Sequence, residues 1–180
     1  MREQLAPKAV REGFAPPPFA FEERNENGDV RFVAWTPDIA QLKRTLYAVL
    51  GQFPEQVEVL FKTETGGESG RDGWQRYCGV AELVAVVEAI RESEELVFHD
   101  GGSMICVKRL DTGDYIALDE HATLFIYSSD RAYLALCENL GFENRVSELI
   151  SAAGHWQVRP AHYLEQERLF TERLNLKPVA

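Results

Sequence analysis

The sequence predicts an α+β fold, a single domain with a mixed, mostly antiparallel sheet whose helices pack mainly on one face. Residues 30–92 alternate between strand-like and helix-like patterns, in the order strand, helix, strand, helix. Residues 95–127 contain four short strand-like runs joined by polar turns, which predicts an antiparallel meander. Helical spacing of apolar residues returns after residue 129, so helices are expected at the carboxyl end.

Residues 1–29 read as an extended amino-terminal arm that precedes the single domain formed by residues 30–180. The three consecutive prolines at 16–18 favour an extended polyproline conformation, and residues 25–29 have the composition of a turn. Phe14, Phe19 and Phe21 would be costly to leave in water. We therefore expect the arm to pack on its own core or on another chain.

The first elements of the domain have clear boundaries. Residues 30–35 form a short strand-like run, and Thr36 with Pro37 then gives the signature of a helix start, with Thr36 as the N-cap. Apolar residues recur at helical spacing from Ile39 to Phe53, and Gly51 stands where a helix would stop. Residues 56–63 alternate between apolar and other side chains, which predicts a second strand.

A glycine-rich loop at residues 65–73 precedes a predicted helix that runs to about Glu92. The expected buried stripe of this helix consists of Val80, Leu83, Val84, Val87 and Ile90. The loop lies where backbone amides could hold a phosphate, but no lysine follows any glycine, and Glu68 and Asp72 would repel an anion. A connecting loop is the favoured interpretation.

The meander and the carboxyl-terminal helices follow. The four predicted strands are Glu95–His99, Met104–Arg109, Tyr115–Leu118 and Thr123–Tyr127. Ser129 or Asp130 can cap the next helix, which should stop at Gly141. A second short helix is expected over residues 146–153 and a terminal helix after Pro160.

The charge distribution favours a protein partner over nucleic acid. The chain has 19 basic and 29 acidic residues, for a net charge of −10. Residues 80–120 contain ten acidic and three basic residues, so they carry 3 − 10 = −7 of that total. Nucleic-acid binding needs a basic stripe, which this region lacks. An acidic face could instead attract a basic protein partner, and its candidate contacts are Asp111, Asp114, Asp119 and Glu120.

A metal site is an alternative interpretation of the turn residues. His99 and Asp100 end one predicted strand, and Asp119 and His121 lie between two later strands. Imidazole and carboxylate groups are ligands of zinc, and a zinc-bound water could be activated for hydrolysis. Polar residues are also the usual occupants of turns, so this pattern has a simple structural explanation.

Other classes are disfavoured by the sequence. The longest apolar runs are too short for a bilayer span, and the amino terminus lacks the apolar region of a secretory signal. Cys78, Cys106 and Cys137 are odd in number and lie among apolar neighbours, as buried thiols of a cytoplasmic protein do. No segment matches a catalytic or cofactor-binding signature, so we expect no cofactor.

The sequence therefore favours a non-enzymatic binding protein, of inhibitor, immunity or adaptor type, that uses an acidic face. The motifs His99–Gly102, Thr112–Tyr115 and Ser128–Ser129 lie within residues 95–142, about a quarter of the chain. This stretch resembles bacterial immunity proteins of the SMI1/KNR4-like group, whereas the early strand–helix portion does not. The alternatives are a metal-assisted hydrolase and a small-ligand sensor whose pocket lies under the 66–73 loop.

Overall fold

A nine-stranded mixed sheet is the framework of the protein. The computed structural model describes residues 8–10, 12–24, 27–65, 73–150, 156–157 and 163–179. The strands of the main sheet are β2 (Phe19–Arg24), β3 (Val30–Trp35), β4 (Gln56–Thr65), β5 (Gly73–Glu82), β6 (Ser103–Arg109), β7 (Tyr115–Leu118), β8 (Thr123–Tyr127), β9 (Glu143–Asn144) and β11 (Lys177–Val179). Their order is β11-β5-β4-β6-β7-β8-β3-β2-β9, and only the β2–β9 pair is parallel. The predicted fold class is confirmed.

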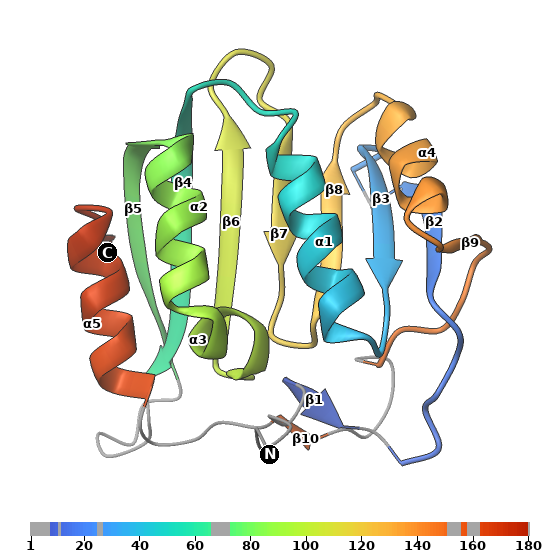
Figure 1. The fold of residues 1–180 in the computed structure, drawn as a ribbon, viewed down its shortest axis with the longest axis horizontal. Coiled ribbons are helices and arrows are strands. Elements are labelled where there is room, and N and C mark those ends of the chain that lie inside the picture. Colours follow the sequence, from blue (N-terminus) through green and yellow to red (C-terminus); the bar gives the residue numbers. More distant parts are fainter. Residues whose placement is uncertain are drawn as a thin grey trace.

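Within the described residues, five helices cover one face of this sheet, the face toward the viewer in Figure 1. They are α1 (Ile39–Leu50), α2 (Leu83–Glu92), α3 (Glu94–His99), α4 (Ala132–Asn139) and α5 (Tyr163–Arg173). A separate two-stranded pair, β1 (Ala9–Val10) with β10 (Trp156–Gln157), lies below the sheet in that view. Of the helices in the described ranges, none has both the length and the apolar composition that a membrane crossing requires.

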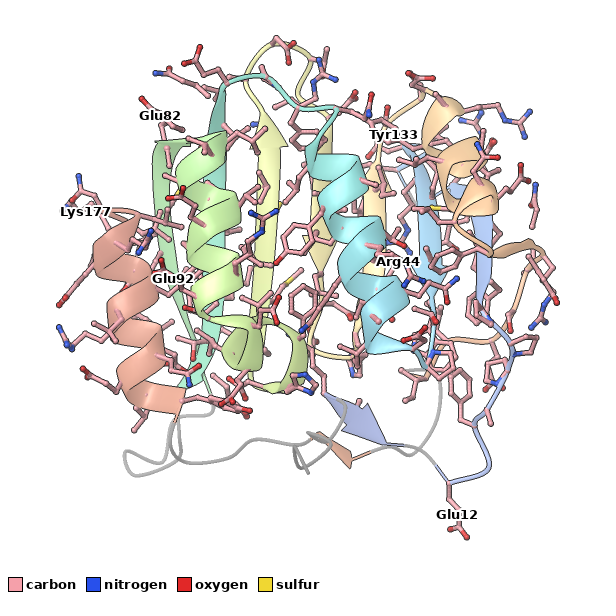
Figure 2. All side chains as sticks on the ribbon, viewed as in Figure 1. Glu12, Arg44, Glu82, Glu92, Tyr133 and Lys177 are labelled. Carbon is pink, nitrogen blue, oxygen red and sulfur yellow. The ribbon has the colours of Figure 1, made fainter. Side chains whose placement is uncertain are left out.

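Strand alternation explains why the helices gather on one face. Along β4, Val57, Val59 and Phe61 are fully buried against the helices, whereas Glu58 and Lys62 point to the other face and stay partly exposed. The same alternation in β6, β7, β8 and β3 makes a continuous apolar surface on the helical side. Figure 2 shows the side chains that fill the space between helices and sheet. The opposite face is more polar, and no described helix covers it.

Several predicted elements have the predicted bounds. Strands β3, β7 and β8 match them residue for residue, and β6 starts one residue earlier than expected. Helix α1 ends at Leu50 with Gly51 as its C-cap, where the sequence predicted the stop. Its N-cap is Asp38 rather than Thr36, because the Asp38 carboxylate accepts a hydrogen bond from the Ala40 amide. Helix α5 begins after Pro160, as expected.

The prediction of a helix directly after the glycine-rich loop is wrong for the first half of that helix. Residues 73–82 form β5, which pairs along its whole length with β4, and helix α2 begins only at Leu83. Val80, placed in the predicted buried stripe, is 58% exposed on the uncovered face, and Val84 is 60% exposed. Residue 79 is a glycine within this strand because a Cβ at that position would lie only 3.1 Å from the Leu176 side chain.

The first strand of the predicted meander is a helix. Residues 94–99 form α3, which follows α2 with only Ser93 between them. Leu96, Val97, Phe98 and His99 are all buried. A run that is buried on every side fits a short interior helix as well as a strand, so the pattern was ambiguous. The meander therefore has three strands, β6 to β8.

Two further segments differ from expectation. Residues 19–24, expected to be irregular, form β2, because Phe19 and Phe21 face one side of the sheet and Ala20 faces the other. The short helix expected over residues 146–153 is absent from its described part, residues 146–150, where only Ile150 has a helical (3₁₀) assignment and Val146 is 78% exposed.

Candidate recognition groove on the uncovered sheet face

The uncovered face of the sheet carries a groove of about 650 Å³. Six neighbouring strands, from β5 to β3, contribute to it. The lining residues are Arg31, Glu58, Leu60, Lys62, Cys78, Met104, Cys106, Lys108, Gly113, Tyr115, Ala117, Asp119, Glu120, Phe125 and Tyr127. Since adjacent strands lie about 4.8 Å apart, the groove extends about 24 Å across the sheet. Its volume lies within the range of about 300–1,000 Å³ typical of ligand sites.

One row of apolar side chains forms the floor of the groove. Strand register places these residues side by side across the sheet, and we call them the central row. In spatial order they are Cys78, Leu60, Cys106, Ala117 and Phe125. The row is one residue wide, unlike the helical side, where the two neighbouring rows that contain Val59 and Phe61 are both apolar. A single apolar row can bury a narrow partner while the rest of the face stays hydrated.

Mostly polar side chains border the central row on both sides, the exceptions being Met104 and, on β5, the exposed Val80. The upper rail, toward the β6–β7 turn, consists of Glu58, Lys108, Tyr115, Tyr127 and Arg31. The lower rail, toward the β7–β8 turn, consists of Arg76, Lys62, Met104, Asp119 and the adjacent Glu120. The lining of the groove contains three basic and three acidic side chains, so it is balanced in formal charge although the chain is acidic.

The upper rail is organised by contacts within the protein. The rings of Tyr115 and Tyr127 stack with their centroids 4.2 Å apart. Arg31 donates a hydrogen bond of 2.7 Å to the Tyr127 hydroxyl and pairs with Glu23. Burial and the neighbouring Tyr127 raise the pKa of Tyr115, so its hydroxyl stays protonated at neutral pH. These contacts fix the side chains before any partner arrives, which lowers the entropic cost of binding.

The chain's own arm covers one end of the apolar floor. Beyond Phe125 the central row continues into Val33 and Phe21, which belong to a second apolar cluster with Phe19 and Trp35. The Phe14 ring packs edge-on against Trp35 with the centroids 4.9 Å apart. In this structure the arm therefore packs on its own chain, one of the two options that the sequence left open.

The thiols in the groove are poor nucleophiles. Burial raises the pKa of Cys106 to about 12 and also raises the pKa of Cys78, whose sulfur lies 3.6 Å from a Glu58 carboxylate oxygen. A thiol with such a pKa is protonated at neutral pH, whereas a catalytic cysteine needs a lowered pKa. These two thiols are therefore not activated nucleophiles.

The four acidic residues proposed as a binding face lie at two ends of the sheet. Asp111 and Asp114 are in the β6–β7 turn, and Asp119 and Glu120 are at the β7–β8 turn. Asp111 forms a two-point ion pair with Arg109, whose hydrogen bonds lower the Asp111 pKa to about 2. The structure thus brings these residues together in pairs, one pair at each end of β7, rather than as one patch.

The proposed metal ligands are only partly brought together. Asp119, Glu120 and His121 have potential ligand atoms within 4.8 Å of one another. His99 and Asp100 lie at the same end of the sheet, but among the described residues they do not belong to that group. The Asp119 carboxylate already accepts hydrogen bonds from the amides of His121 and Thr123, and it contacts the His121 ring at 3.2 Å.

A fully buried lysine supplies positive charge at this end of the sheet. Lys8 donates hydrogen bonds of 2.7 and 3.2 Å to the carbonyl and hydroxyl oxygens of Ser103. Burial lowers its pKa to about 8, while the charges of Asp100, Asp119 and Glu120 act in the opposite direction. The ammonium group thus offsets part of the negative charge of Asp100 and Asp119, two of the residues proposed from the sequence as metal ligands.

The loop proposed to cover a small-ligand pocket is largely outside the described residues, since residues 66–72 are not among them. Sequence reasoning missed most of the groove, including Leu60, Lys62, Ala117 and Phe125. These side chains lie on the less buried face of predicted strands, where they looked like ordinary surface residues. The one available signal was the mixed character of that face, in which Leu60 follows Glu58 and precedes Lys62.

Comparison with known proteins gives no further assignment. No family model matches the chain, and no curated protein or solved structure matches it either. The resemblance of residues 95–142 to immunity proteins therefore gains no support from relatives, and the function is argued from the geometry of the groove.

Proposed function

We propose that this is a non-enzymatic protein that binds an extended segment of a partner protein in the groove on its uncovered sheet face. The observation that carries the proposal is the apolar central row between two polar rails. A groove about 24 Å long matches an extended segment of about seven residues, at about 3.3 Å per residue. A compact small molecule would occupy only part of that length.

The amino-terminal arm supports an extended segment as the occupant. Residues 14–18, which include three prolines, have no regular secondary structure, and Phe14 packs against the end of the same apolar surface. A partner segment would pack on the central row as Phe14 packs on the apolar cluster beside its end. Glu120 lines the groove, and Asp114 lies in the turn at the other end of β7, so both could contact basic residues of that partner.

A selection from random peptides tests the proposal even though the partner is unidentified. The full-length protein would be used to select from a phage-displayed library of nine-residue peptides. Enriched peptides are expected to bind Leu60→Gln at least about tenfold more weakly, because this change removes apolar surface from the central row. Leu164→Gln is the matched control, since Leu164 is 67% exposed on α5 and does not line the groove.

Two results would contradict the proposal. One is a selection that enriches no peptide, and the other is a set of peptides that binds Leu60→Gln as well as the unchanged protein. Stabilisation of the protein by a compound from a small-molecule library, when no peptide is enriched, would favour the ligand-sensor alternative instead.

A further inference from the structure

The lower rail of the groove begins with two positive charges placed directly opposite each other. Lys62 and Arg76 are partners in the β4–β5 register, and both side chains point to the uncovered face. Within the described ranges neither side chain is in an ion pair, and Lys62 lines the groove. Like charges directly opposite each other on neighbouring strands are unfavourable. An anionic group bound between them would relieve that repulsion.

The same rail ends with an available negative charge. Glu120 lines the groove and keeps a quarter of its side chain exposed, with one carboxylate oxygen 3.8 Å from the His121 ring. Asp119 is less available, because its carboxylate is engaged by the amides of His121 and Thr123. The lower rail is therefore bipolar, basic on β5 and β4 and acidic where β7 ends.

The distance between the basic and acidic ends of the lower rail sets the spacing of charged residues in a peptide that would contact both. Strands β5 and β7 are three neighbours apart in the order β5-β4-β6-β7, which corresponds to about 14 Å. Four residues of extended chain span about 13 Å, and side chains at positions i and i+4 point to the same side. The side chain at i+2 would lie over Met104, between the two charged ends.

We infer that the groove recognises a partner segment with an acidic and a basic residue four positions apart and an apolar residue midway between them. The acidic residue of the partner segment pairs with Lys62 and Arg76, and its basic residue pairs with Glu120. This assignment rests on the proposed function, because it names the chemistry of the segment that the groove would hold.

Synthetic peptides with controlled charges test the inference. The reference peptide is Thr-Asp-Thr-Leu-Thr-Lys-Thr, with blocked ends and with threonines that favour an extended chain. Binding to the full-length protein would be measured at low salt. Neutralising Asp or Lys in the peptide should each weaken binding about two- to fivefold, since partly exposed ion pairs contribute about that much. A peptide with the two charges three positions apart should bind more weakly, because they then point to opposite sides.

Double-mutant cycles assign each peptide charge to its partner on the protein. Replacing the peptide Asp by Asn should cost nothing further once Lys62→Gln and Arg76→Gln have been introduced. Replacing the peptide Lys by Gln should cost nothing further in Glu120→Gln. Arg44→Gln is the control for the loss of a positive charge, because Arg44 projects from α1 on the helical side (Figure 2).

The outcomes separate this inference from the proposed function. One outcome would overturn the inference but not the proposed function. In that outcome, peptides bind the protein and bind Leu60→Gln more weakly, but their charges show no coupling to Lys62, Arg76 or Glu120. The absence of binding by every peptide, including those enriched from the library, would overturn both. Coupling of the acidic residue to Lys62 and Arg76, but not to Arg44, is the expected result.

Discussion

The ammonium nitrogen of Lys8 lies 2.7 Å from the carbonyl oxygen of Ser103, although 95 positions separate the two residues. Ser103 begins β6, and its hydroxyl also contacts the carbonyl oxygens of Leu96 and Asp100 at the end of α3. This contact fastens the amino-terminal arm to the end of the sheet where the β7–β8 turn lies. The buried charge at this position also makes stability depend on pH.

The first prediction concerns alkaline pH. Burial lowers the pKa of Lys8 from 10.5 to about 8. Below pH 8 both the folded and the unfolded chain hold the proton, and the cost of burying the ammonium group is fully present. Between pH 8 and 10.5 the unfolded chain holds more protons, so the contribution of Lys8 to the free energy of unfolding rises with pH, by at most about 3 kcal/mol.

Urea titrations of the protein and of Lys8→Met between pH 7.5 and 10.5 check this prediction. The difference between their free energies of unfolding should shift in favour of the unchanged protein as pH rises. Tyrosines and cysteines also titrate in this range, but they are common to both proteins and largely cancel in the difference. A difference that is constant across the range would contradict the burial of a charged Lys8.

A second prediction concerns His121. Burial acts to lower its pKa, but the hydrogen bond and charge of Asp119, together with the charge of Glu120, outweigh it, so the pKa is raised above 6.5. Asp119→Asn should lower the pKa of His121, because the amide removes the negative charge while its oxygen can still accept from the backbone amides. An NMR titration of the His121 ring protons measures the change. Glu120→Gln should lower that pKa less, and an equal effect of both variants would be inconsistent with the contact described.

The third prediction concerns the arm. Phe14→Ala should lower the free energy of unfolding by about 1–2 kcal/mol, because Phe14 is only partly buried and loses one edge-on ring contact with Trp35. Glu12→Ala is the control, since Glu12 is exposed just before it (Figure 2). Equal stability of both variants would mean that the arm does not hold its place on the sheet in solution.

The fourth prediction uses the thiols as reporters of the groove. A peptide bound over the central row should slow the reaction of Cys78 with iodoacetamide, because Cys78 lines the groove. Cys137 is buried on the helical side and is the internal control, and its slow reaction should not change. Mass spectrometry of the alkylated peptides gives both rates in one sample. An unchanged Cys78 rate at saturating peptide would place the binding site elsewhere.

The meander was predictable from sequence, and β5 was not, for a physical reason. Strands β6 to β8 have one strongly apolar face, so their alternation is visible, and polar turns mark their ends. On β5 both faces are mixed, because Cys78 and Val80 lie on the uncovered side. Its pattern therefore resembled the start of the helix that follows.

The groove could not be predicted because it depends on strand order. Strand β4 lies beside β6, and β3 lies beside β8, although neither pair is consecutive in the sequence. Local patterns identify strands but do not give their order in the sheet. The acidic turns were visible in the sequence as polar runs, yet β7 separates them in space.

The most direct test of the groove is NMR mapping with a peptide enriched by the selection. Backbone amide shifts would be recorded for the full-length protein with increasing peptide. The largest shifts are expected at Leu60, Cys106, Ala117 and Phe125, with little change in α2 and α5. Shifts centred on the helices, or confined to the turn that contains Asp111 and Asp114, would contradict binding in the groove.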